Sequence, residues 1–128
     1  MTVPQVYRGD GMNALLIESC SFGSIVINGK TYKDDLIVLP DGKIIKPWWR
    51  PRGHQLNMND LTALIDSSPD VIVVGTGIHG RVIPDETLSN DLSCLAIELI
   101  AKPNEEAIRR LNGLQPGKRV GACFHLTC

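Results

Sequence analysis

The chain has 128 residues, of which 43% are hydrophobic and 21% are charged. This length predicts a single domain, because two smaller ones could not each bury a core, and the composition excludes a disordered chain. Lysine and arginine together number 13 and aspartate and glutamate 14, so the net charge of −1 gives no overall attraction to nucleic acid or to a membrane surface.

We expect residues 1–20, MTVPQVYRGDGMNALLIESC, to form an N-terminal arm ahead of one domain over residues 21–128. Pro4, Gly9 and Gly11 interrupt this segment, and no hydrophobic period runs through it. It has neither a basic start nor a long apolar core, so we expect no signal peptide and a cytoplasmic protein. The apolar runs of the chain are shorter than the ~18 residues that a membrane helix needs, so we expect no membrane partner.

Two hairpins are predicted after the arm. SIVI and KTYK flank the turn Asn28-Gly29, and LIVL and KII flank Pro40-Asp41-Gly42. Asn-Gly between two β-rich runs is the strongest short-range hairpin signal, because both turn residues adopt positive φ. The first third of the chain is therefore predicted to be a β-meander.

Helices and strands are predicted to alternate over the rest of the chain. NMNDLTALIDSS (57–68) predicts a helix capped by Asn57 or Asn59, PDETLSNDL (84–92) a short helix with Pro84 at its first position, and PNEEAIRRLNG (103–113) another helix. DVIVVG (70–75), CLAIELI (94–100) and RVGACFHL (119–126) predict strands, the first two buried. This order predicts an α/β fold with a single mixed β-sheet, in which N-terminal hairpins precede alternating helices and strands.

The loop after the strand at 70–75 has glycines at positions 75, 77 and 80, which is the G-x-G-x-x-G spacing of a dinucleotide-binding fingerprint. Such a site also needs a helix that begins near the third glycine and an acidic residue about 20 positions further on. Pro84 starts the next predicted helix too late, the first turn of that helix is acidic, and Glu98 falls inside a strand. We therefore expect no dinucleotide cofactor. The loop is either a tight turn or the floor of a small-ligand site, since it follows a buried strand.

A basic and aromatic segment, KIIKPWWRPRGHQL, occupies residues 43–56. Tryptophan and arginine dominate the energetics of protein interfaces, so Trp48, Trp49, Arg50 and Arg52 form a candidate interaction surface. If the segment is extended, one tryptophan faces the core, and we expect the other to be exposed together with Arg50. These residue types also bind single-stranded nucleic acid, but the near-neutral charge argues against that partner.

No metal site is predicted. The three histidines, His54, His79 and His125, and the four cysteines show no ligand spacing on a predicted element. Without a secretion signal the cysteines are expected to be reduced thiols. In the last predicted strand, Cys123 and His125 share a face.

Taken in order, the motifs resemble one known family, the Mth-nine-three-eight-like domain family. The resemblance rests on SFGSIVINGKTYKDDLIVLPDGK, WWR, GHQL, VIVVGTGIHG, IPDETL and RVGACFHLTC, and it spans about residues 20–128. It implies a three-layer α/β fold around a mixed sheet. The family includes the adipogenesis-associated domain protein and a mitochondrial complex I assembly factor, which act through protein partners. The resemblance implies no catalytic role for any residue that matches the family pattern. The matching residues are Trp49, Arg50, His54, Gly75, Gly77, Gly80, Asn112, His125 and Cys128.

Two functions from different classes follow. The first is a non-catalytic protein-binding or assembly factor with an unidentified protein partner. The second is a binding protein or an enzyme for a small anionic ligand, which requires the glycine loop and the tryptophan segment to meet in the fold. The residues assigned to this ligand site are Gly75, Thr76, Gly77, His79, Gly80, Arg81 and His54, with Arg50 as a further source of positive charge.

Overall fold

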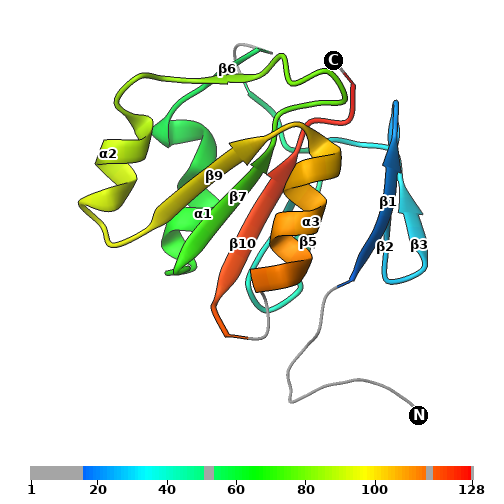
Figure 1. The fold of residues 1–128 in the computed structure, drawn as a ribbon, viewed down its shortest axis with the longest axis horizontal. Coiled ribbons are helices and arrows are strands. Elements are labelled where there is room, and N and C mark those ends of the chain that lie inside the picture. Colours follow the sequence, from blue (N-terminus) through cyan, green and yellow to red (C-terminus); the bar gives the residue numbers. More distant parts are fainter. Residues whose placement is uncertain (1–15, 51–53, 115–116, 128) are drawn as a thin grey trace.

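The computed structural model describes residues 16–50, 54–114 and 117–127 (Figure 1). Within this part of the chain, the central sheet has five strands in the order β5-β4-β10-β7-β9. β10 is parallel to β7 and β7 to β9, whereas β4 is antiparallel to β10 and to β5. The sheet is therefore mixed, as predicted. Its strands are β4 (Leu36–Val38), β5 (Ile44–Ile45), β7 (Val71–Gly75), β9 (Glu98–Lys102) and β10 (Val120–Phe124).

The N-terminal meander consists of β1 (Ile17–Ser21), β2 (Ser24–Ile27) and β3 (Lys30–Tyr32). The turn between β2 and β3 is Asn28-Gly29, and both residues have positive φ, 50° and 82°, which confirms the predicted hairpin. The meander forms a sheet of its own and does not join the central one, so the prediction of a single sheet was wrong in this respect. Its apolar side chains pack on the central sheet instead of extending it.

Side chains alternate between the two faces of the buried strands and so divide the core into two clusters. Val71 and Val73 of β7 face α3 (Asn104–Leu114) and the meander, whereas Ile72 and Val74 face the opposite cluster. The second cluster contains the apolar residues of the 3₁₀ helix η1 (Met58–Leu61), α1 (Thr62–Asp66) and α2 (Leu88–Ser93). Figure 1 shows the resulting three-layer α/β arrangement, with α3 and the meander on one side of the sheet and α1 behind it. In the described part of the chain, no helix combines the length and hydrophobicity needed to span a membrane.

Several element boundaries differ from those predicted. β1 starts at Ile17, within the predicted arm of residues 1–20, and Ile17 is buried in the core. The helix expected from Pro84 begins at Leu88, because Pro84 belongs to β8 (Ile83–Pro84), which pairs in parallel with β6 (Gln55–Leu56). The strand expected at 94–100 begins at Glu98, because α2 and the turn that follows it extend to Ala96, which has a positive φ of 61°.

Candidate functional site

Most of the candidate residues lie at one end of the central sheet, where β7 and β10 end and β4 begins. His125 follows β10, Asp35 precedes β4, and the glycine loop follows β7. The loop and the chain after β10 are joined by a hydrogen bond from the N–H of Ile78 to the C=O of Thr127, 2.8 Å long. Figure 1 shows β6 and the segment that follows β10 at this same end. The fold thus brings the glycine loop close to the segment of His125.

A buried ionic network forms the centre of this region. The Asp35 carboxylate lies 2.7 Å from His125 Nδ1 and 3.4 Å from the Arg50 guanidinium, and Arg50 Nη2 lies 3.0 Å from the same His125 nitrogen. We place the Nδ1 proton on the contact with Asp35, because this contact is the shorter one and a carboxylate can only accept. The second Asp35 oxygen accepts the backbone N–H of Leu126 at 2.8 Å. Asp35 therefore balances the charge of Arg50 and fixes the orientation of the His125 ring.

Arg50 and Trp48 are buried together, while Trp49 is exposed. The Arg50 guanidinium carbon lies 4.2 Å from the centre of the Trp48 ring, a cation–π geometry. Trp48 donates its ring N–H to the C=O of Asp60 at 2.9 Å and its backbone N–H to the C=O of Asp35 at 2.7 Å. The exposed fractions are 4% for Trp48, 9% for Arg50 and 75% for Trp49.

The expectation that Arg50 is exposed beside one tryptophan is therefore wrong. The segment does alternate as an extended chain should, but Trp48 and Arg50 share the inner face. The half-buried carboxylate of Asp35 is the physical reason, because it gives the buried guanidinium a partner within the protein. Arg52, the fourth residue of the predicted surface, lies outside the described residues.

The glycine loop is closed by internal packing. A side chain at position 75 would collide with the Phe124 ring and with Asn104, and Gly77 and Gly80 have φ values of 112° and 68°, which favour glycine. Asn104, which is 1% exposed, accepts the N–H of Gly77 at 3.0 Å and donates to the C=O of His125 at 2.7 Å.

The remaining backbone donors of the loop are also largely used within the protein. The N–H groups of Thr76, Ile78, Gly80 and Val82 each donate to a backbone carbonyl. An anion or an oxyanion intermediate would need such donors directed toward it. The glycines here allow a tight turn and a close backbone approach, and the N–H groups of Thr76, Gly77, Ile78, Gly80 and Val82 donate within the protein.

The other residues assigned to the ligand site are dispersed. The ring of His54 meets the His125 ring edge to face, with centroids 5.9 Å apart, and its C=O accepts the N–H of Ile83. Thr76 is buried, whereas His79 and Arg81 lie on the exposed side of the loop. The fold thus brings His54, His125 and Arg50 together and leaves His79 and Arg81 facing outward.

A carboxylate, an imidazole and a hydroxyl are connected in series at this site. Beyond the Asp35 contact, the Thr127 hydroxyl lies within hydrogen-bond distance of His125 Nε2, at 3.2 Å. This connectivity resembles a nucleophilic triad. Acyl transfer also requires an oxyanion hole, and the adjacent loop uses its N–H groups internally. The network consequently has a structural explanation: it orders the chain after β10.

Two cysteines near this end are poor nucleophiles. Burial raises the pKa of the Cys123 thiol, which is fully enclosed in β10. Burial also raises the pKa of Cys20, partly offset by the hydrogen bond that its sulfur accepts from Asn104 Nδ2 at 3.5 Å. The thiolate is the reactive form, so a raised pKa leaves less of it near neutral pH than an ordinary cysteine has. In residues 16–50, 54–114 and 117–127, no three His, Cys, Asp or Glu side chains are grouped so as to hold a metal ion.

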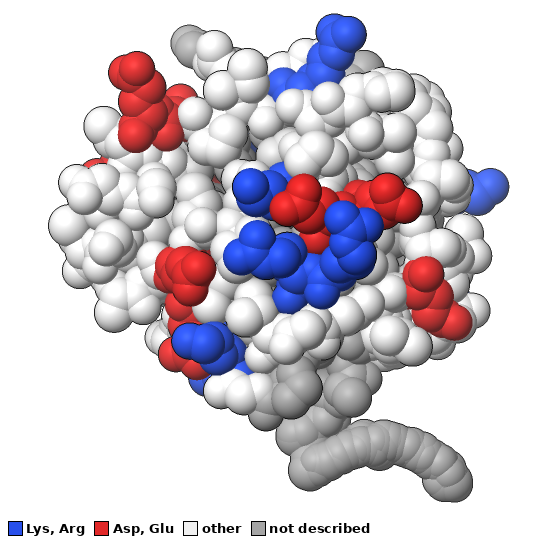
Figure 2. Space-filling view, viewed as in Figure 1, with Lys and Arg blue, Asp and Glu red and all other residues white. Residues whose placement is uncertain are grey.

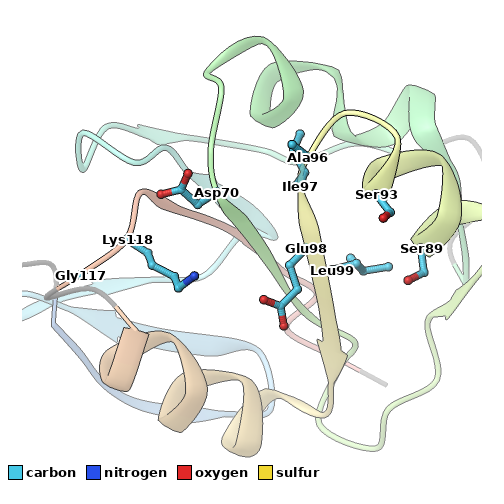
Figure 3. A pocket seen from close by; sticks show the side chains of 9 residues that line it. All are labelled: Asp70, Ser89, Ser93, Ala96, Ile97, Glu98, Leu99, Gly117 and Lys118. Atoms are coloured by element: carbon cyan, nitrogen blue, oxygen red, sulfur yellow. The ribbon is translucent and has the colours of Figure 1, made fainter.

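Asn104 was missed by sequence reasoning, although it follows the proline that marks a helix start. A second missed feature is an open cavity of about 610 Å³ at the opposite end of the sheet, next to β9 (Figure 3). Its lining residues are Asp70, Ser89, Ser93, Ala96, Ile97, Glu98, Leu99, Gly117 and Lys118. They come from several distant segments, so no local motif marks the cavity.

Surface charge does not mark a nucleic-acid site on the face shown in Figure 2. Acidic and basic side chains gather side by side there, over α3. The exposed face of α3 carries both signs, with Glu105 in its first turn and Arg109 and Arg110 further along. Alternating charges of this kind belong to a solvated helix surface.

Known proteins place the chain in a family. Residues 17–125 match the family described as "Protein of unknown function (DUF498/DUF598)". The chain belongs to this family. Its similarity to MT938 and to a Mth938-like domain confirms the resemblance seen in the sequence. None of the curated proteins matches the chain in sequence.

Solved structures support the family assignment along nearly the whole chain. A conserved hypothetical protein from Pyrococcus horikoshii OT3 is 30% identical, with 88% of this chain and 98% of that one covered and a TM-score of 0.73. MT938 is 27% identical, with 89% and 99% covered and a TM-score of 0.74. A Mth938-like domain from Bordetella pertussis is 17% identical, with 91% and 89% covered and a TM-score of 0.67, and it shows the fold alone. The DUF498/DUF598 family thus gives this chain a fold and a set of relatives.

Proposed function

We propose that this protein is a non-catalytic binding or assembly factor of the cytoplasm that holds a protein partner through Trp49. The observation that carries the proposal is the contrast between Trp49, which is 75% exposed, and its buried neighbours Trp48 and Arg50. An exposed tryptophan offers a large apolar contact area, and tryptophan is enriched among the residues that dominate interface energies.

The backbone that carries Trp49 is already ordered. Trp48 is tied to Asp35 and Asp60 by hydrogen bonds, and Arg50 is paired with Asp35. Ordering a binding loop costs free energy of association, so an anchor on a fixed backbone binds at a lower cost. The ionic network of Asp35, Arg50 and His125 therefore supports binding of the protein partner, because it holds the backbone that directs Trp49 outward.

The alternative is a small anionic ligand at residues 75–80, and it has less support. The positive charge of Arg50 is balanced by Asp35, and the N–H groups of Thr76, Gly77 and Ile78 donate within the protein. An anion would find the Arg50 guanidinium already paired and the N–H groups of Thr76, Gly77 and Ile78 already used.

Site-specific photo-crosslinking in the cell tests the proposal. A photoreactive phenylalanine analogue replaces Trp49 in one variant and Phe22 in a control; Phe22 is 63% exposed and lies in the turn between β1 and β2 of the meander. We expect a discrete crosslinked species from position 49 and none of the same mass from position 22. Added wild-type protein should compete for that species, and Trp49→Ala protein should not. Equal competition by both proteins would contradict the proposal.

A further inference from the structure

The outer edge of β9 is an unpaired strand edge. β9 is the terminal strand of the central sheet, and its partner on the inner side is β7. Glu98 donates its N–H to the C=O of Asp70 at 3.0 Å, and the C=O of Lys102 accepts from Thr76 at 2.9 Å. The backbone groups of Glu98, Ile100 and Lys102 therefore point toward β7.

Because backbone groups alternate in direction along a strand, Leu99 and Ala101 point their N–H and C=O groups away from β7. Within the described ranges, no residue pairs with these outward groups. The open cavity of about 610 Å³ lies over this edge, with Glu98 and Leu99 of β9 between Ser89 and Ser93 of α2 on one side and Lys118 on the other (Figure 3). An accessible row of unpaired backbone groups is a template for another strand.

We propose that two copies of this chain pair through β9, antiparallel, about a two-fold axis at Ile100. In this register Leu99 of each copy lies opposite Ala101 of the other. Both residues have outward backbone groups, so they form closely spaced hydrogen-bonded pairs of an antiparallel ladder. The two central sheets then continue into one sheet across the axis.

Charge complementarity supports this occupant and this register. Glu98 and Lys102 lie at the two ends of β9, on the same face as Ile100. An antiparallel arrangement centred on Ile100 places Glu98 of each copy opposite Lys102 of the other. Directly opposite side chains lie about 5 Å apart at Cβ, and pairs of opposite charge stabilise the pairing. The opposite charges at the two ends of β9, an exposed Glu98 and a half-buried Lys102, thus favour pairing with a second copy in the antiparallel orientation.

Neighbouring registers lose these contacts. Centring the axis on Ala101 places Leu99 opposite Pro103, which has no N–H to donate. Centring it on Leu99 places Ala101 opposite Ile97, whose N–H already donates to Leu92 at 3.0 Å. Only the register at Ile100 uses all the outward groups of Leu99 and Ala101.

Sedimentation velocity of the full chain over a range of concentrations tests the pairing. We expect a reversible monomer–dimer equilibrium that weakens as salt is added. Glu98→Lys and Lys102→Glu each place like charges opposite one another at two symmetric positions, and each should raise the dissociation constant roughly tenfold. The double variant Glu98→Lys/Lys102→Glu restores opposite charges and should recover most of the wild-type affinity. Thermal melts at low concentration check that each variant is folded.

A backbone variant tests the hydrogen bonds independently of charge. Leu99→Pro removes an outward N–H and leaves the ladder with β7 intact, because proline is tolerated on the free side of an edge strand. We expect it to abolish the dimer while the monomer stays folded. A chain that is monomeric at every concentration, including one in which β9 pairs only with a different protein, would overturn the proposal. So would a dimer that is insensitive to the single charge reversals or to Leu99→Pro.

Discussion

The two ends of the central sheet differ in how their polar groups are used. At the end where β7 and β10 finish, Asp35 pairs with Arg50 and contacts His125, and Asn104 joins the glycine loop to the C=O of His125. At the opposite end, the charged side chain of Lys118 lines an open cavity beside a free strand edge. The end with the more conspicuous sequence motif is the closed one. A glycine spacing or a cluster of basic and aromatic residues can therefore serve packing. The contact surface proposed at β9 consists of residues that form no recognisable sequence motif.

Removing the charge of Asp35 should produce the largest loss of stability. Asp35→Asn leaves the buried Arg50 without its carboxylate, and breaking a buried ion pair costs about 3 kcal/mol once the partial exposure of Asp35 is considered. Chemical denaturation measures this change. Asp34→Asn, at an exposed neighbouring position, is the matched control and should be nearly neutral. An equal, small effect of both changes would show that the network does not support the fold.

Gly75→Ala should destabilise the same end by overpacking. The new methyl group would collide with the Phe124 ring and with Asn104, and forced repacking of a core costs about 2 kcal/mol. Gly113→Ala is the control, because that helical position is open and alanine favours a helix by about 1 kcal/mol over glycine. Thermal melts should shift in opposite directions for the two variants. A stable Gly75→Ala protein would mean that the loop is not packed against β10.

Alkaline pH should weaken the fold through Cys123. Burial raises the pKa of this thiol in the folded state, so the unfolded chain loses the proton first, near the ordinary value of ~8.5. The contribution of the buried thiol to the free energy of unfolding is fully present below that pH. Above that pH it decreases by about 1.4 kcal/mol per pH unit. Denaturation at several alkaline pH values should show a shallower decline for Cys123→Ala than for wild type. Cys94→Ala, at an exposed position, should keep the wild-type slope.

At the amino end of the strands, a single charge should matter little to stability. Lys118→Gln changes an exposed residue that lines the cavity, and such changes stay within about 0.5 kcal/mol. Denaturation at a protein concentration below the dissociation constant of the proposed dimer measures the monomer alone. A loss comparable with that of Asp35→Asn would remove the contrast between the two ends.

Local signals predicted the elements better than their boundaries. Asn28-Gly29 correctly predicted a hairpin, and the apolar run at 71–74 correctly predicted a strand buried on both faces. The helix start was misplaced because Pro84 suits a helix and a β-ribbon alike, and only pairing with β6, far away in the sequence, decides between them.

The site could be predicted only as a set of residues, not as an arrangement. Asp35 and His125 are 90 positions apart, so no spacing rule connects them. Alternation alone does not tell which of the two tryptophans is buried. Asp35 draws Arg50 inward, and Trp48 is buried because it lies on the same face of the segment as Arg50. Fold class follows from periodicity, whereas a buried ion pair follows from tertiary contacts that one sequence does not display.

Amide hydrogen exchange at residues 75–82, followed by NMR with and without inorganic phosphate, tests most directly whether the conspicuous end is closed. The N–H groups of Gly77, Ile78 and Val82 donate within the protein, so they should exchange slowly. Phosphate should leave their rates and chemical shifts unchanged. Fast exchange that phosphate slows would contradict the account and would show the loop to be a site for an anion.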